Sequence, residues 1–146
     1  MPVRMRHFAF ALLLGTAAVP VTAALTAPER TMAATVDAEY DRSVALLEKL
    51  TNQNSGSLNI EGVTKVGEMM RAELEPLGFE VKWVPMAEAK RAGHIVATHK
   101  GNGRGKRMLL IGHLDTVFEA DSPFQRFRRI DANTAEGPGI DDDKGG

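Results

Sequence analysis

The chain has 146 residues, of which 43% are hydrophobic and 25% are charged, and it contains no cysteine. This composition is typical of a globular domain and excludes a disordered tail, a collagen-like chain and a coiled coil. Because 18 Lys and Arg residues stand against 19 Asp and Glu residues, there is no basic excess to neutralise phosphates, and we expect no nucleic-acid partner. The absence of cysteine excludes disulfides, thiol nucleophiles and thiolate metal ligands.

Residues 1–24 have the pattern of a secretory signal peptide. Arg4 and Arg6 give a positive start, residues 8–21 are mostly apolar, and small residues follow up to Ala24. A membrane anchor is the alternative, but this apolar run is shorter than the ~20 residues that span a bilayer. We therefore expect an exported protein, periplasmic or secreted, with no membrane span after removal of the signal.

The mature chain is expected to begin with a linker and two helices. Residues 25–36 are rich in Ala and Thr and show no periodicity, which favours a linker. Apolar residues recur at helical spacing from Asp37 to Leu50, and again from Glu61 to a stop at Pro76. Each pattern predicts an amphipathic helix.

Three strands are predicted after the helices. Residues 79–83 alternate between apolar and charged side chains, residues 94–98 form a second short run, and residues 108–111 are apolar on both faces. A strand of the last kind is typical of the centre of a sheet. The glycine-rich residues 101–106 lack the spacing of a phosphate-binding loop and are predicted to be a turn. Together these patterns indicate an α/β layered fold whose sheet is only partly present.

The first chemically informative segment follows the predicted central strand. His113 lies where this strand ends, at the edge where α/β sheets present side chains to a ligand. In an extended chain His113 and Asp115 point to the same side. Asp115 can then accept a hydrogen bond from one imidazole nitrogen while the other nitrogen binds a metal.

The second informative segment is residues 137–146, where Asp141, Asp142 and Asp143 are flanked by glycines. Glycines permit the close approach and unusual dihedral angles that an ion-binding loop requires. The spacing does not supply the closing Glu of an EF-hand. Imidazole and carboxylate donors without thiolate suit zinc, manganese or cobalt at a hydrolytic site better than calcium.

The two motifs, H-x-D-T-V at residues 113–117 and G-P-G-I-x-D-x-K-G-G at residues 137–146, resemble the co-catalytic zinc family of glutamate carboxypeptidase, aminoacylase and succinyl-diaminopimelate desuccinylase. The likeness is greatest to glutamate carboxypeptidase and covers essentially the whole mature chain. The resemblance implies that residues 37–146 are the N-terminal part of a zinc-peptidase-like catalytic domain, a mixed sheet flanked by helices. It also implies amide hydrolysis, with a small peptide or N-acyl amino acid as substrate and C-terminal glutamate as the group released.

From the alignment of the two motifs with those of the family, the resemblance implies that His113 is a ligand of one zinc ion, that Asp115 orients its imidazole, and that Asp142 bridges two zinc ions. The resemblance further implies a cis peptide bond after Asp142. In the family the zinc ions polarise the scissile carbonyl and acidify a water, and a Glu takes the proton. That Glu, the remaining ligands and a dimerising domain correspond to positions beyond Gly146. We therefore expect a truncated catalytic domain that is inactive alone, with a homodimer only for the full-length protein.

Two other functions remain open from the sequence. A short exported protein could keep the front half of this fold as a non-catalytic binding or interaction module, which would require a soluble, cooperatively folded product. A metal-buffering protein would depend on the acidic loop alone and would require a zinc site tighter than scattered surface carboxylates.

Overall fold

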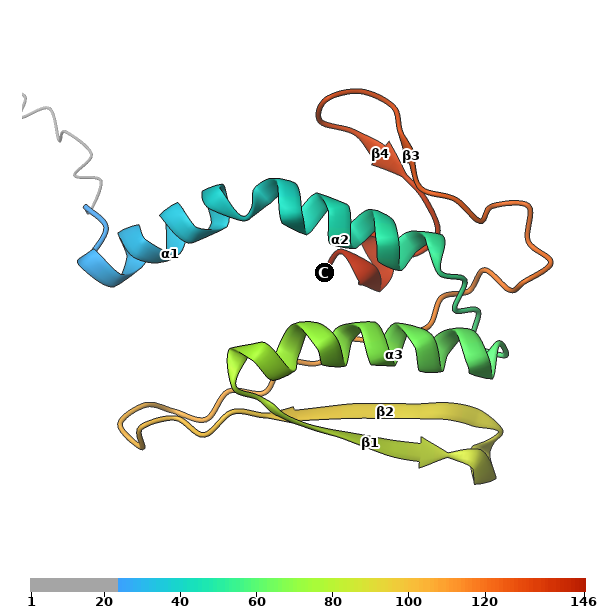
Figure 1. Ribbon diagram of the computed structural model, residues 1–146, viewed down its shortest axis with the longest axis horizontal. Coiled ribbons are helices and arrows are strands. Elements are labelled where there is room, and N and C mark those ends of the chain that lie inside the picture. The colour runs from blue at the N-terminus through green and yellow to red at the C-terminus, as the bar shows by residue number, and fades with distance from the viewer. Residues whose placement is uncertain (1–23) are drawn as a thin grey trace, which may run out of the picture.

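The computed structural model describes residues 24–146 (Figure 1). The predicted signal peptide, residues 1–24, lies outside the described residues except for Ala24. The helices are α1 (Ala27–Ala38), α2 (Tyr40–Asn52) and α3 (Ile60–Leu74), and the strands are β1 (Glu80–Met86), β2 (Arg91–Thr98), β3 (Arg128–Arg129) and β4 (Ala135–Glu136). Short turns η1 (Glu75–Leu77) and η2 (Ala87–Ala89) flank β1, and a wider turn, η3 (Ile140–Lys144), lies near the C-terminal end. Among these residues, no helix combines the length and apolar character needed to cross a membrane.

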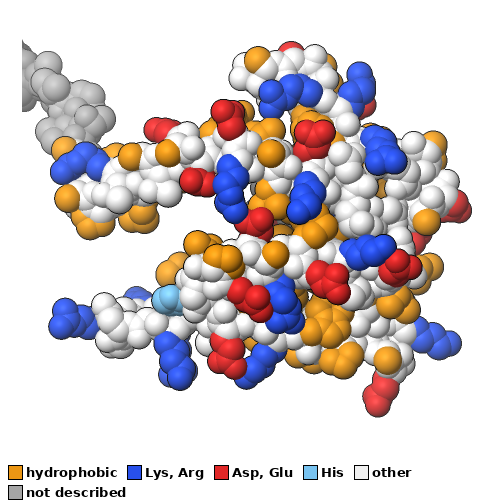
Figure 2. Space-filling view, viewed as in Figure 1, with side chains coloured by type: hydrophobic (Ala, Val, Ile, Leu, Met, Phe, Trp, Pro, Cys, Tyr) orange, Lys and Arg blue, Asp and Glu red, His pale blue; other side chains and the backbone are white. Residues whose placement is uncertain are grey.

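Helix α1 occupies the segment predicted to be an aperiodic linker. The Thr26 hydroxyl accepts a hydrogen bond from the Glu29 N–H, and the Glu29 carboxylate accepts one from the Thr26 N–H at 2.6 Å. This capping box satisfies two N–H groups at the start of the helix. No residue of α1 is buried, and α1 projects from the body with hydrophobic side chains exposed (Figure 2). The prediction of linker conformation was wrong because a helix that buries no face against the described residues leaves no apolar periodicity in the sequence.

The main core lies between α3 and the β1–β2 hairpin. The hairpin is antiparallel, with Trp83 opposite Ile95. Gly67 of α3 lies against the indole, since a Cβ at this position would be 2.7 Å from Cζ3 of Trp83. Val63 and Val66 of the same helix are buried, at 5% and 2% exposure. The helix and the two strands predicted for this region are confirmed.

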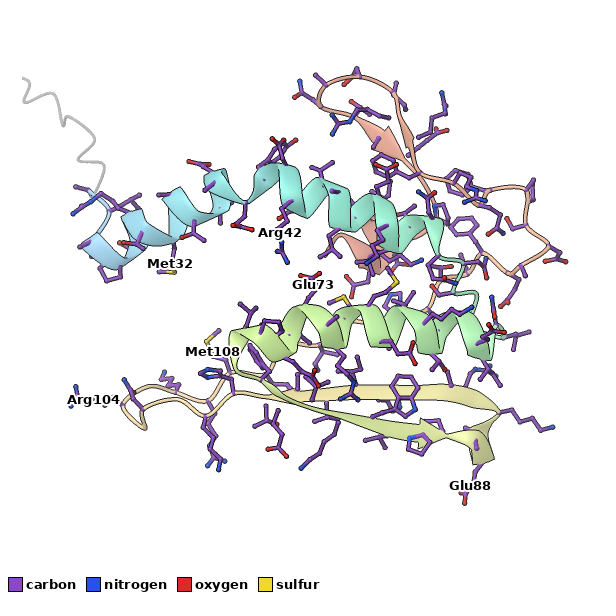
Figure 3. All side chains as sticks on the ribbon, in the orientation of Figure 1. Met32, Arg42, Glu73, Glu88, Arg104 and Met108 are labelled. Carbon is purple, nitrogen blue, oxygen red and sulfur yellow. The ribbon has the colours of Figure 1, made fainter. Side chains whose placement is uncertain are left out.

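Helix α2 lies on the other side of α3, so that α2, α3 and the hairpin form successive layers (Figure 1). Arg42 of α2 points toward Glu73 of α3 and forms an ion pair with it (Figure 3). At the C-terminal end of α2, Leu50 and Thr51 are buried where the turn η3 packs against the helix. The first predicted helix, from Asp37 to Leu50, is thus present with its start shifted to Tyr40.

The buried central strand predicted for residues 108–111 is not formed. These four side chains are 82–87% exposed. The strands among residues 24–146 form two separate two-stranded antiparallel sheets, β1–β2 and β3–β4, and neither includes this segment. An apolar strand is stable in the centre of a sheet only where both edges are paired and both faces covered. The helices and strands confirm the α/β class, but the strands form two small antiparallel sheets instead of the predicted mixed sheet.

Candidate metal centre

Two loops that are distant in the sequence are joined beside the end of α2. The Thr116 N–H donates to the Ser55 carbonyl at 2.8 Å, and the Ser57 N–H donates to the Thr116 carbonyl at 3.1 Å, which makes one parallel bridge between Gly56 and Thr116. The Asn54 side-chain amide also donates to the Phe118 carbonyl at 2.9 Å. These bonds fix the backbone that carries His113 and Asp115, although residues 108–111 before it are exposed.

The imidazole of His113 lies between two acceptors. Nε2 is 2.8 Å from Oδ1 of Asp142, and Nδ1 is 2.9 Å from the Asp115 carbonyl oxygen and 3.3 Å from Oδ1 of the Asp115 carboxylate. The hydrogen bond to Asp142 raises the pKa of His113 above its ordinary value; partial burial opposes this rise, and the bond to the Asp115 carbonyl adds to it. Both ring nitrogens thus face an oxygen atom, and an imidazolium, which donates from both nitrogens, matches these two acceptors.

The three consecutive aspartates, Asp141 to Asp143, have different surroundings. The Asp142 carboxylate faces Nε2 of His113, the Asp143 carboxylate accepts from the His113 N–H at 3.1 Å, and Asp141 is exposed. The peptide bond between Asp142 and Asp143 is cis, as the resemblance implied. Gly139 has φ of +78°, and a Cβ there would lie 2.7 Å from the Thr116 methyl. Only glycine combines this conformation with this approach, so the loop of residues 137–146 lies directly against the loop that carries His113.

Lys144 anchors the acidic loop to α2 and does not point at the imidazole. Its ammonium donates to the Leu50 and Gln53 carbonyls, each at 2.8 Å. These carbonyls belong to the C-terminal end of α2, where a cation and extra donors are favourable. Burial lowers the pKa of Lys144 to about 8. The sequence motif contains this lysine, but nothing in its spacing indicates a contact with α2.

A second residue missed in the sequence is Ser57, whose hydroxyl donates to Oδ2 of Asp115 at 2.5 Å. In the sequence Ser57 lies in a polar, glycine-containing stretch, residues 51–58, which carries no motif. No spacing rule connects it with a carboxylate 58 positions later. The structure therefore brings the three predicted site residues together and adds a partner to Asp115.

The donor atoms fit one side of a zinc site. Nε2 of His113 and Oδ1 of Asp142 converge, and imidazole nitrogen and carboxylate oxygen are both common zinc ligands. Nδ1 is directed to Asp115, as expected for a ligating histidine held by an acceptor. Within residues 24–146 no group of three or more His, Asp or Glu side chains could hold a metal. His113 and Asp142 would supply two of the three or four protein ligands that zinc requires, and their ligand roles stay predictions.

Comparison with known proteins identifies a homologue of this chain. No protein-family model matches the chain. The chain is 37% identical over 142 residues to carboxypeptidase G2 of Pseudomonas sp. (strain RS-16), a match that covers 94% of this chain and 33% of that protein. The chain is homologous to carboxypeptidase G2 and spans about a third of its length. This homology agrees with the resemblance to carboxypeptidases expected from the two motifs, over the third of carboxypeptidase G2 that the chain matches.

Proposed function

From the homology to carboxypeptidase G2 we propose that this chain forms the N-terminal part of the catalytic domain of an exported zinc-dependent amide hydrolase. The substrate is a small peptide or N-acyl amino acid, and the group released is a C-terminal glutamate. One observation carries the proposal: His113 and Asp142, 29 positions apart, converge at 2.8 Å in the order and register of the family motifs. Export to the periplasm or medium is supported by the signal pattern of residues 1–24.

The residues of this chain have distinct tasks in such an enzyme. His113 and Asp142 would hold zinc, and bound zinc polarises a carbonyl and acidifies a water. Asp115 accepts from Nδ1 of His113 and so leaves Nε2 for the metal. Lys144 holds the loop that carries Asp142 against α2. We assign the general base, the remaining ligands and the contacts of the homodimer to none of these residues, so the chain alone is expected to be inactive.

The test is a chimera in which this chain replaces the segment of carboxypeptidase G2 that it matches. The chimera should bind two zinc ions and hydrolyse N-acyl glutamates. Replacement of a ligand, by His113→Ala or Asp142→Asn, should lower kcat/KM by at least ~100-fold, which is the upper range for partners that only touch a ligand. Asp141→Asn is the matched control because Asp141 adjoins Asp142 in the sequence and is exposed as Asp142 is, and it should change kcat/KM by less than about threefold.

Two results would contradict the proposal. The first is a folded, zinc-loaded chimera whose activity is the same with Asp142→Asn as with Asp141→Asn. The second is turnover by the isolated chain with zinc, since this would place a complete catalytic site within it. A folded, inactive chimera and a cooperatively folded isolated chain would together favour the alternative, a non-catalytic binding or interaction module.

A further inference from the structure

The Asp115 carboxylate is held by two partners, one on each oxygen. Oδ2 accepts the hydroxyl proton of Ser57 at 2.5 Å, and Oδ1 lies 3.3 Å from Nδ1 of His113. Bonds to a charged acceptor are roughly twice as strong as neutral ones. The longer contact of the same hydroxyl, 3.4 Å to the Thr116 carbonyl, is therefore the weaker one. The carboxylate cannot rotate away from the imidazole without breaking its bond to Ser57.

The backbone around Ser57 is arranged to bring its hydroxyl to this point. The Ser57 N–H donates to the Thr116 carbonyl at 3.1 Å, and the Leu58 N–H donates to Oε1 of Glu119 at 3.1 Å. Gly56 permits this approach, because a Cβ there would be 2.6 Å from Cα of Glu119. A residue other than glycine would push this loop, and Ser57 with it, away from Asp115.

We propose that Ser57 is a positioning residue of the metal site, whose hydroxyl fixes the Asp115 carboxylate on the Nδ1 side of His113 so that Nε2 faces the metal. This inference rests on the proposed function, because it assigns His113 as a zinc ligand. The hydrogen bond from position 57 that forms the bridge between the two loops is donated by the backbone N–H, which every residue except proline retains. Loss of the hydroxyl removes its bond to Asp115 and its 3.4 Å contact with the Thr116 carbonyl, but it leaves the bridge in place.

The test compares four variants of the full chain. Ser57→Ala removes the hydroxyl, while Ser57→Thr and Ser57→Val are an isosteric pair that differ only in hydroxyl against methyl. Ser55→Ala is the matched control, because the Ser55 hydroxyl is buried in the same loop and has no hydrogen-bond partner among residues 24–146. Circular dichroism establishes that each variant is folded, and the Thr and Val pair isolates the hydroxyl even if Ala loosens the loop.

Two readouts are taken from the ring nitrogens of His113 by NMR. Without metal, at a pH where the ring is neutral, loss of one hydrogen bond should lower the ratio of the Nδ1–H to the Nε2–H form by about fivefold in Ser57→Ala and Ser57→Val. On titration with zinc chloride, the same two variants should bind zinc about 10-fold more weakly, the lower end for partners of a ligating histidine. Ser57→Thr and Ser55→Ala should stay within about twofold of wild type in both.

The inference is overturned if Ser57→Val matches Ser57→Thr in both readouts, or if Ser55→Ala causes the same losses as Ser57→Ala. Failure of the proposed function looks different. In that case the His113 resonances of wild type do not respond to zinc, or respond no more than in Asp142→Asn. The metal-free tautomer ratio then still reports whether Ser57 positions Asp115.

Discussion

Replacement of Lys144 by methionine tests whether the acidic loop depends on its anchor to α2. Methionine keeps the apolar stem but removes the two hydrogen bonds, each 2.8 Å long, to the Leu50 and Gln53 carbonyls. Bonds from a charged donor contribute ~1.5–3 kcal/mol each. Partial exposure weakens this contribution, and desolvation of the ammonium, which lowers its pKa to about 8, opposes it. We expect a net loss of about 2 kcal/mol in the free energy of unfolding.

Urea denaturation followed by circular dichroism measures this loss, and a thermal melt should show the midpoint lowered by about 8 °C for a domain of this size. Lys144→Arg keeps a charged donor and serves as the control, with a smaller loss. Lys144→Met should also weaken the contact between Asp142 and His113, because the same turn carries Asp142. A change below about 0.5 kcal/mol in Lys144→Met, the range of ordinary surface substitutions, would refute the anchoring role.

The pH dependence of stability gives an independent check on the burial of Lys144. Its pKa in the folded chain, about 8, lies below the ordinary value of 10.5. Between these pH values the unfolded chain binds more protons than the folded chain, so the free energy of unfolding contributed by this group increases with pH. The difference in stability between wild type and Lys144→Met should therefore grow from pH 8 to pH 10. A difference that is constant over this range would mean that the ammonium is fully solvated.

Three further perturbations test the site and the fold. Asp142→Asn should lower the raised pKa of His113 toward its ordinary value in an NMR titration with a chelator present. The stability that this contact contributes is complete below the ordinary pKa of histidine and is lost as pH rises through the raised pKa. An unchanged pKa would contradict the contact. Gly139→Ala should lower the free energy of unfolding by ~1–3 kcal/mol more than Gly103→Ala in urea denaturation, because both positions have similar positive φ but a Cβ at Gly103 meets no atom of residues 24–146 within 4 Å. Equal losses would show that crowding plays no part. Thr26→Ala should speed hydrogen exchange in α1 without shifting the global melting midpoint, since no residue of α1 is buried; a lower midpoint would mean that α1 packs on the domain.

Local sequence patterns predicted the elements whose partners are near in the chain. The apolar face of α3 and the alternation of apolar and charged side chains around Trp83 can both be read from neighbouring residues in the sequence. In the structure α3 and β1 each contact β2 directly. The segment of residues 108–111 carries an equally clear pattern, but a central strand is defined by its neighbours, and no strand among the described residues pairs with it. The prediction for helix α1 failed for a different reason. No residue of this helix is buried, so its start is marked by a capping box and not by an apolar periodicity.

The site shows the same division between local and distant information. His113, Asp115 and Asp142 could be selected because each lies in a motif of fixed spacing, and the structure brings them together. Ser57 and Lys144 could not be selected, because their contacts with Asp115 and Leu50 span 58 and 94 positions. Ser57 orients Asp115, and Lys144 holds the turn that carries Asp142. Residues with such supporting roles have no characteristic spacing in a sequence.

The position of His113 follows from contacts on one side of its segment. After residue 112 the backbone is fixed by the Asp143 carboxylate at the His113 N–H and by the bridge to Ser55 at Thr116. Before it, residues 108–111 are exposed and join no sheet among the described residues. A strand that pairs with these residues would restrict His113 from the other side and lower the entropy lost when Nε2 and Asp142 take up a metal. Zinc affinity and pairing of residues 108–111 are therefore expected to reinforce each other.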